Sequence, residues 1–464
     1  MDTGRHYKNS ILSLSFRSRT VFLILMLAIP LWVSAQSGNQ WSLDKCMSYA
    51  LENSMAVKQK SLELETQKIR LQATKLNMLP ALEATIGQNI DFGMATTSSA
   101  LKISNNQTRT SLGINMQMSL FEGLRTYHQI ASDKLGLQAL LYDLENAKEN
   151  VKLLVTAYYL QVLLNQEYVK MMQEQEQLTT TQIDRIQQLV ENGKCAESEL
   201  YTVKATYAND HLSVVDAQNN LRLAKLDLAQ LINYPSPAEF DIVPIDISEL
   251  FAQLLDKSAD IRHILDFALT NRPAVKSALL RIEQNKKAIQ IYRAGWYPKL
   301  YLYASYGTGY FYMFNDNPLY PNSPFFTQFN RNSQEVLGLS LNVPLFDRLA
   351  TYHNVKLAKV SVLSAELQLE ESKRNLIKEI EQAYTNAVTS KEKYRAAEAA
   401  EAATKIAFEY EEIKFNAGSS TNYEFNDAKT KYLKAQSQLL QSKFDFLFRV
   451  MILEFYGKNE NTTN

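Results

Sequence analysis

The sequence has little glycine and little proline, 14 and 11 residues out of 464. Both residue types interrupt helices, glycine through its backbone entropy and proline through its missing N–H group. So few interruptions over this length favour long, continuous helices. Cysteine is scarcer still: Cys46 and Cys195 are distant in the chain and too few for a disulfide framework, so we expect both to be unpaired.

The sequence also lacks an excess of either charge, because 49 basic and 49 acidic residues give a formal net charge of +0. Without a basic excess, nucleic acid is not an expected partner. The five histidines form no His-Glu-x-x-His motif, and the chain has neither a glycine-rich phosphate loop nor a Gly-x-Ser-x-Gly elbow. We therefore predict no enzyme activity, no cofactor and no metal site. His128 and His353 occupy equivalent positions and are interpreted as packing or interface residues, with a metal role as the less favoured alternative.

Long apolar runs are missing except near the N-terminus, where Val21 to Val33 follows several basic residues. Val33-Ser34-Ala35 is suited to cleavage, so residues 1–35 are predicted to be a signal peptide. A membrane anchor is the alternative, although the run is short for one. Since no later run of about 20 apolar residues occurs, we expect no inner-membrane helix.

What the sequence does contain is an internal repeat. The stretch 112–128 returns as 337–353, shifted by 225 residues, with 8 of 17 positions identical. Each copy alternates apolar and polar residues for about ten positions, which is typical of a two-faced β-strand. Roughly nine to eleven residues is the length of a tilted strand that crosses a bilayer.

A second alternating segment precedes each copy, so each half contains a hairpin of two strands. Long segments without proline follow the hairpins, and each reaches a short polar turn near a glycine, Gly193 or Gly418. The repeat therefore predicts two similar units, each with a helix, a hairpin, a long helix, a tip and a return helix. Their ranges are 36–232, with its hairpin at 81–121 and its tip near 193, and 261–464, with its hairpin at 300–346 and its tip near 418, joined by a linker at 233–260.

The detailed pattern sets bounds for the elements. It predicts one helix from Ser42 to Asn77, strands at 81–92, 111–121, 300–312 and 337–346, and a loop at 314–332. The long helices are predicted at 122–191 and 347–416, and their equal length puts both tips at the same level. Tyrosines in the third strand are interpreted as an interfacial girdle or as ordinary strand packing: Tyr301, Tyr303, Tyr310 and Tyr312.

Four membrane strands leave two open edges, and unpaired backbone groups in lipid cost several kcal/mol each, so a barrel has to close. The smallest single-chain barrels have about eight strands. The chain is therefore predicted to share its barrel with copies of itself, two copies giving eight strands and three giving twelve.

These features resemble the outer-membrane factor (TolC) family of trimeric export ducts. The resemblance covers essentially the whole chain after the signal peptide. It is carried by the repeat, the strand–Leu-Phe–long-helix junctions, the glycine-centred tips and the opening segment Trp41–Cys46 followed by Ala50-Leu51-Glu52-Asn53. It implies a mainly α fold with a β-barrel portion, in which three protomers complete a twelve-stranded β-barrel and antiparallel coiled-coil helices form an α-barrel.

The resemblance also implies a function. The chain is expected in the outer membrane with a long periplasmic extension, as the passive channel-tunnel of a tripartite efflux or type I secretion system. Its implied partners are two further copies of the chain, outer-membrane lipid, a periplasmic adaptor (membrane fusion) protein and an inner-membrane pump of RND or ABC type. Drugs, metals and proteins remain alternative cargoes.

The family's motif assigns gate residues at the tips by their offsets from Gly193 and Gly418. The matching positions are Gln188, Glu199, Phe415, Glu424 and Asp427, and the candidate adaptor contacts are Gly193, Lys194, Gly418 and Ser419. The family's clamp arginine has no counterpart, because Ser420 stands there. A ring of carboxylates would repel anions and attract cations. The alternative is that Glu199 and Glu424, near helix N-termini, only complement the helix dipole.

The sequence leaves two alternative functions. A periplasmic coiled-coil scaffold or adaptor without a pore would need the helices, but it would not need four membrane-length strands. An enzyme ranks last because no catalytic motif is present.

Overall fold

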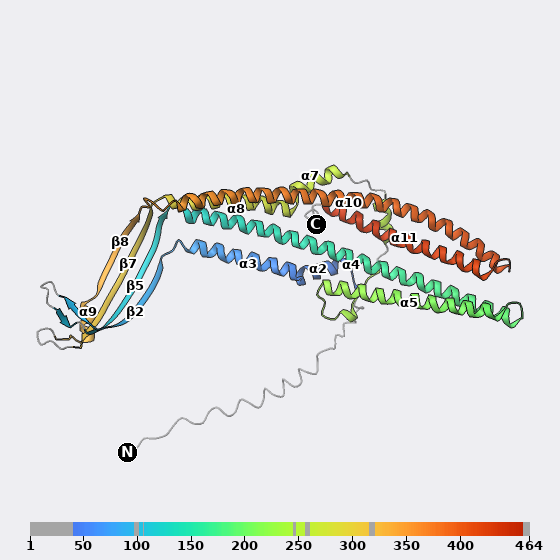
Figure 1. Cartoon of the computed structure of the whole chain (residues 1–464), viewed down its shortest axis with the longest axis horizontal. Helices are drawn as coiled ribbons and strands as arrows, with labels where there is room; N and C mark the ends of the chain where they lie inside the picture. The colour runs from blue at the N-terminus through green and yellow to red at the C-terminus, as the bar shows by residue number, and fades with distance from the viewer. Residues whose placement is uncertain are drawn as a thin grey trace, which may run out of the picture.

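The computed structural model describes residues 40–96, 102–104, 106–244, 247–255, 260–314 and 321–457. The predicted signal peptide, residues 1–35, lies outside this part of the chain. Figure 1 shows an elongated molecule with a β-sheet at one end and the tips of two long helical hairpins at the other. The tips and the membrane-length strands are thus separated by the whole length of the helices.

The first half of the chain contains one strand pair and one long helical hairpin. Its main elements are α2 (Leu43–Asn53), α3 (Met55–Leu76), β2 (Ala81–Asp91), β5 (Gln107–Glu122), α4 (Arg125–Glu191) and α5 (Glu197–Leu231). The second half has the same order. Its elements are α7 (Ile261–Asn271), α8 (Pro273–Arg293), β7 (Lys299–Met313), β8 (Gln334–Asn342), α10 (Ala350–Asn416) and α11 (Asn422–Gly457).

Short elements complete the fold. The strand β1 (Gln40–Trp41) pairs in parallel with β6 (Asp241–Ile242), which joins the start of the described chain to the region between the halves. The remaining short elements are β3 (Met94–Thr96), β4 (Lys102–Ser104), η1 (Pro237–Glu239), α6 (Ile247–Leu255), η2 (Ala294–Trp296) and α9 (Phe325–Arg331). The helix α9 corrects the prediction of a loop over 314–332; the Gln328 side chain pairs with both backbone groups of Phe311 and so holds α9 against β7.

The helix predicted from Ser42 to Asn77 is two helices. Ser42 caps α2 by accepting a hydrogen bond from the Lys45 N–H at 3.3 Å, as an N-cap serine does. Ser54 then adopts φ −59° and ψ 129°, which is not helical, and the chain restarts as α3. Periodicity did not reveal this break because the apolar spacing continues across it.

The long helices α4 and α10 each contain 67 residues, which corresponds to about 100 Å of helix. Their equal length was predicted, but each begins three residues later than expected. Two consecutive residues with positive φ precede each helix: Gly123 and Leu124 before α4, and Arg348 and Leu349 before α10. A left-handed pair cannot be part of a right-handed helix, so the helix starts after it.

These junctions give a first prediction. Arg348 has φ 56° at the position that glycine occupies in the first half, and left-handed backbone costs a non-glycine residue about 1–2 kcal/mol. We expect Arg348→Gly to leave stability unchanged or to raise it by up to about 1 kcal/mol. The reverse change, Gly123→Arg, should destabilise, because a Cβ there would lie 2.8 Å from the Tyr297 Cβ and 2.9 Å from the Ala294 carbonyl oxygen. Thermal unfolding of the detergent-solubilised protein measures both, and equal midpoints for the two variants would contradict the prediction.

The four long strands form one antiparallel sheet in the order β2-β5-β7-β8. The pairing of β5 with β7 joins the two halves, as the neighbouring arrows in Figure 1 show. Among the described residues, β2 and β8 each pair with only one strand of this sheet, so both of its edges are open. The predicted last strand, 337–346, ends earlier, at Asn342, because Pro344 has no N–H group to donate to a ladder.

The register places apolar residues together on one face of the sheet. Leu82 pairs with Met116, Met116 with Ala304, and Ala304 with Leu337, so one row across all four strands is apolar. A neighbouring row on the other face runs through Thr85, Gly113, Gly307 and Gln334. The sheet therefore has one apolar face and one mostly polar face, which is the arrangement expected of a barrel wall between lipid and water.

The tyrosines of β7 divide between these faces. Strand alternation puts Tyr310 and Tyr312 on the face of Ala304, whereas Tyr301 and Tyr303 lie on the polar face. The Tyr301 hydroxyl donates to Glu122 at 3.2 Å, and Tyr303 covers Gly338, whose Cβ would meet its ring at 2.5 Å. These contacts fit the alternative of ordinary strand packing for Tyr301 and Tyr303, and the interfacial girdle stays an interpretation for Tyr310 and Tyr312.

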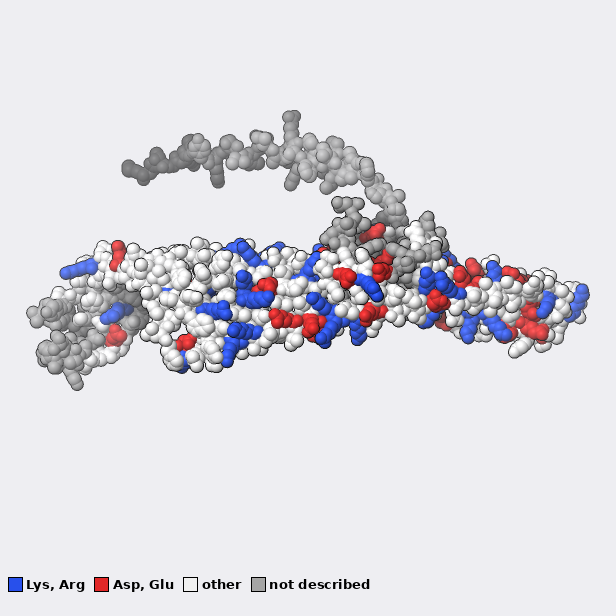
Figure 2. Space-filling view, turned by 90° about the horizontal axis from the view of Figure 1, so that it is seen from above, with Lys and Arg blue, Asp and Glu red and all other residues white. Residues whose placement is uncertain are grey.

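Charged side chains are distributed unevenly along the molecule. Figure 2 shows that Lys, Arg, Asp and Glu are frequent along the helices and sparse over the sheet end. None of the helices in the described residues combines the length and the apolar character needed to cross a bilayer.

The largest buried cluster lies midway along the molecule. It includes Trp41, Tyr159 of α4, Leu228 of α5 and Phe446 of α11. The Tyr159 hydroxyl donates to the Val243 carbonyl oxygen at 2.8 Å, which satisfies its one buried polar group. Because this cluster takes residues from both halves, it holds the two helical hairpins together far from their tips.

Candidate functional site at the helical tips

Both tips end a long helix in the same way. Gly193 has φ 67°; its N–H donates to the Val190 carbonyl at 2.9 Å, and the next N–H, of Lys194, donates to Leu189 at 2.8 Å. Gly418 has φ 74° and makes the equivalent bonds, with Ser419 donating to Lys414 at 2.9 Å. This is the Schellman arrangement, in which a left-handed residue favours glycine. The tip glycines thus have a conformational role in each turn.

Glu424 is part of a capping box at the start of α11. The Thr421 N–H donates to the Glu424 carboxylate at 2.9 Å, and the Glu424 N–H donates to the Thr421 hydroxyl oxygen at 3.2 Å. These reciprocal bonds satisfy two backbone donors of the helix terminus. The hydrogen bonds from Thr421 lower the pKa of Glu424 below its usual value, so the side chain is a carboxylate at neutral pH. Glu424 therefore caps the N-terminus of α11, and its side chain is also exposed.

Glu199 contacts the other hairpin through an asparagine. The Asn422 amide donates to the Glu199 carboxylate at 3.1 Å, and Asn422 Oδ1 accepts hydrogen bonds from Gln182 Nε2 at 3.0 Å and from Asn426 Nδ2 at 3.1 Å. Gln182 lies on α4, Glu199 on α5 and Asn422 on α11. The structure thus brings Glu199 to the first turn of the helix that carries Glu424.

Arg185 of α4 binds the end of α10. Its guanidinium donates to the carbonyl oxygens of Phe415, at 3.1 Å, and Asn416, at 2.8 Å, and also contacts the Asn416 side chain. A cation that donates to the last carbonyls of a helix is favoured by the helix dipole. The guanidinium also lies 5.2 Å from the centre of the Phe415 ring, which stacks on Phe425 at 4.6 Å.

The remaining predicted residues make local contacts. Asp427 pairs with Lys431, one turn on, at 2.6 Å, and both side chains are exposed. Gln188 is exposed and contributes its backbone carbonyl, which accepts from Asn192 Nδ2 at 2.7 Å. Lys194 is exposed, and the Ser419 hydroxyl donates to the Lys414 carbonyl at 3.1 Å.

Ser420 occupies the position of the family's clamp arginine and is bound locally, to Glu411 and, at 3.3 Å, to Glu424. The only guanidinium among the described residues that bridges the two tips is instead Arg185, which belongs to the other hairpin. Sequence reasoning missed this residue, because nothing local marks an arginine whose partner lies 230 positions away.

One further feature of the tip region was missed. Lys429 of α11 is buried and paired with Asp210 of α5. A lysine four residues after Phe425, on an otherwise buried helical face, was a signal that could have been noticed. Among the described residues, no three His, Cys, Asp or Glu side chains are grouped so that they could hold a metal ion.

A two-faced sheet of membrane-length strands that continues into paired 67-residue helices is the architecture of an outer-membrane channel with a long periplasmic extension. The comparisons with known proteins agree. A family model described as "Outer membrane efflux protein" matches residues 264–447, which lie in the second half of the chain.

Two relatives match over almost the full length. The proteases secretion protein PrtF of Dickeya chrysanthemi is 21% identical over 436 residues, covering 91% of this chain and 89% of that protein. The outer membrane protein TolC of Vibrio cholerae is 22% identical over 434 residues, covering 92% of this chain and 94% of that protein. The solved structure of the outer membrane protein VceC from Vibrio cholerae superposes with a TM-score of 0.72 at 17% identity, covering 89% of this chain and 96% of that one.

The family match over residues 264–447 and the similarity to TolC over almost the full length confirm the resemblance that the sequence predicted. The chain is an outer-membrane channel protein with a long periplasmic helical extension, and it is not an enzyme. The interpretation as a scaffold without a pore is set aside on the same grounds.

Proposed function

We propose that the chain is the passive exit duct of a tripartite efflux or type I secretion system, working with a periplasmic adaptor and an inner-membrane pump of RND or ABC type. The observation that carries this proposal is the distance between its two specialised ends. One end is a sheet of membrane-length strands, and the other is a pair of exposed tips about 100 Å of helix away. The relatives named for secretion of proteases support the same role.

The duct is proposed to be a homotrimer. The open edges of β2 and β8 cannot remain unpaired in lipid, since buried unpaired backbone groups cost several kcal/mol each. Pairing β8 of one copy with β2 of the next satisfies both edges, and three copies give a barrel of about twelve strands, within the range seen for membrane barrels.

The gate is proposed to lie at the tips, with Gln188 and Phe415 beside three acidic residues: Glu199, Glu424 and Asp427. In a trimer nine carboxylates would surround the entrance, repel anions and attract cations. Glu424 is suited to this role as well as to its cap, because its exposed carboxylate is ionised at neutral pH. Arg185 is proposed as the contact that closes the entrance. It would replace the family's clamp arginine, at whose position this chain has Ser420. Gly193, Lys194, Gly418 and Ser419 are proposed as adaptor contacts because they form the outermost turns.

The acidic gate is tested by Glu199→Gln with Glu424→Gln in the mature protein. Glutamine keeps hydrogen bonding but removes up to six charges per trimer, so the preference for cations over anions should fall by roughly threefold or more, as expected of a charged ring. The measurement is the reversal potential of single channels in a planar bilayer under a salt gradient. Glu370→Gln with Glu371→Gln, on an exposed part of α10 far from the tips, is the matched control. An unchanged reversal potential in the tip variant would remove the gate assignment and leave the channel assignment standing.

A further inference from the structure

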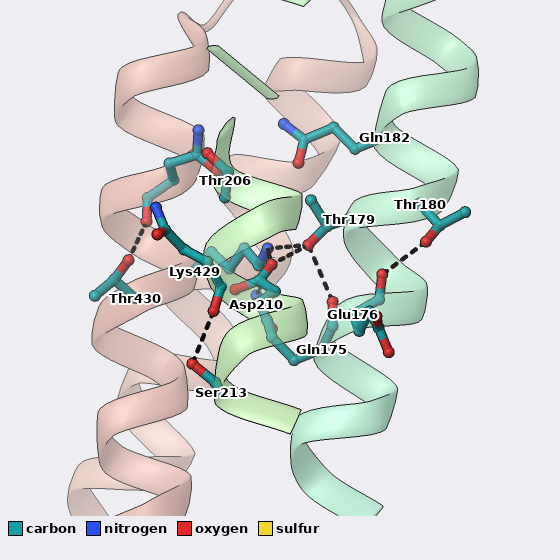
Figure 3. A network of polar contacts seen from close by, with 12 residues as sticks. Gln175, Glu176, Thr179, Thr180, Gln182, Thr206, Asp210, Ser213, Lys429 and Thr430 are labelled. Atoms are coloured by element: carbon teal, nitrogen blue, oxygen red, sulfur yellow. Dashed lines mark hydrogen bonds and ion pairs between the residues drawn. The ribbon is translucent and has the colours of Figure 1, made fainter. Parts of the chain in front are cut away.

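A buried lysine connects the two helical hairpins close to their tips. Lys429 of α11 is 3% exposed, and its ammonium donates to the Thr179 hydroxyl of α4 at 2.6 Å and to the Asp210 carboxylate of α5 at 3.1 Å. Figure 3 shows Lys429 reaching from α11 to the place where Thr179 and Asp210 converge. Thr179 also donates to Asp210, and Gln175 of α4 donates to the same carboxylate at 3.4 Å. One ammonium therefore holds three helices.

The site surrounds the Lys429 ammonium with acceptors. Burial lowers the pKa of Lys429 from its usual value, and the Asp210 carboxylate opposes that shift only in part. Asp210 Oδ2 accepts hydrogen bonds from the Lys429 ammonium, the Thr179 hydroxyl and the Gln175 amide. The negative charge of the carboxylate is therefore well compensated. Removing one member of such a buried pair is costly, because it leaves the other charge without a partner. The pair therefore favours the arrangement in which α11 lies against α4 and α5.

The position of Lys429 also fixes the rotation of α11. With about 100° per residue, Asp427 and Glu424 both lie more than 120° around the helix from Lys429. The burial agrees, since Phe425 and Lys429 are buried on one face, while Glu424 and Asp427 are exposed. When Lys429 points at the first hairpin, these two carboxylates must point away from it.

We propose that Lys429 is a positioning residue for the acidic tip: its ion pair with Asp210 docks the second hairpin on the first and turns the exposed face of α11, with Glu424 and Asp427, toward the channel entrance. The docking and the rotation of α11 depend only on the contacts above. The direction toward the entrance depends on the proposed function.

The test uses the mature, detergent-extracted protein and the variant Lys429→Met, which keeps the length of the side chain but not its charge. Hydrogen exchange of the backbone over residues 422–432 reports docking without any assumption about transport. We expect exchange there to rise roughly tenfold or more, because the buried carboxylate of Asp210 loses its partner. Lys434→Met removes an exposed lysine from the same helix and should leave exchange unchanged. Thr179→Val, which removes only a hydroxyl, should give a smaller rise in the same segment.

The exchanged pair Lys429→Asp with Asp210→Lys separates charge from packing, and it should recover part of the protection that Lys429→Met loses. Channel recordings form the second arm, in which Lys429→Met should lower the cation preference while Lys434→Met does not. Unchanged exchange in Lys429→Met would overturn the proposal. If exchange in Lys429→Met were faster but the ion preference unchanged, the claim that Lys429 turns the acidic face toward the entrance would be wrong. Its role in docking α11 would still stand. Faster exchange in a protein that forms no channels, even as wild type, would overturn the proposed duct and not the docking.

Discussion

Replacing Ile86 by arginine is expected to abolish stable insertion into the outer membrane. Ile86 lies at the centre of the 11-residue strand β2, is 76% exposed and pairs with Leu112 on the apolar face. An arginine at the midplane of a barrel strand costs about 2–4 kcal/mol when it faces lipid. The proposed trimer would pay this cost three times, which is comparable with the whole stability of a typical domain.

The neighbouring residue provides the control. Thr85 pairs with Gly113 on the polar face, where an arginine has both space and water. We expect Thr85→Arg to reach the outer membrane at wild-type levels and Ile86→Arg to be lost from it, as measured by membrane fractionation and immunoblotting. If both variants inserted equally well, the assignment of the apolar face to lipid would be wrong.

The second large effect is expected from Arg185→Ala. The guanidinium makes two charge-assisted bonds to the carbonyl end of α10, and bonds of this kind contribute about 1.5–3 kcal/mol each. Their loss should shift the balance between docked and undocked tips by roughly tenfold or more, since each 1.4 kcal/mol corresponds to a factor of ten. We therefore expect larger or longer channel openings in planar bilayers.

Arg374→Ala is the matched control, because Arg374 is an exposed arginine on α10 that only pairs with Glu370, one turn away, at 3.4 Å. Its currents should equal those of the wild type. Wild-type currents in Arg185→Ala would show that the contact with Phe415 and Asn416 does not hold the entrance closed, and attention would move to the pair formed by Glu199 and Asn422.

Much of the fold could be predicted, because the pattern that specifies it is local and occurs twice. Alternation identified the four strands, and the absence of proline identified the two long helices. The details that were wrong depend on single backbone conformations, such as the extended Ser54 between α2 and α3 and the left-handed Arg348 before α10. Neither residue type is one that favours these conformations strongly enough to be recognised from sequence.

The candidate site was less accessible. Glu424 follows Thr421 by three positions, which is the spacing of a capping box and was available from the sequence alone. Arg185, Asn422 and Lys429 could not be assigned in this way, because each acts on a residue more than 200 positions away. Their partners follow from how the two hairpins pack, which local patterns do not determine.

The equal length of α4 and α10 also restricts how this protein can evolve. An insertion of seven residues in one of them would move its tip by about 10 Å relative to the other. It would also break the contacts of Arg185 and Lys429, which require matched levels in the two hairpins. Insertions and deletions are therefore expected to survive only as coordinated pairs, one in each half. Substitutions do not change the length of a helix, so two halves that differ at 9 of 17 positions in the repeated stretch can still have helices of identical length.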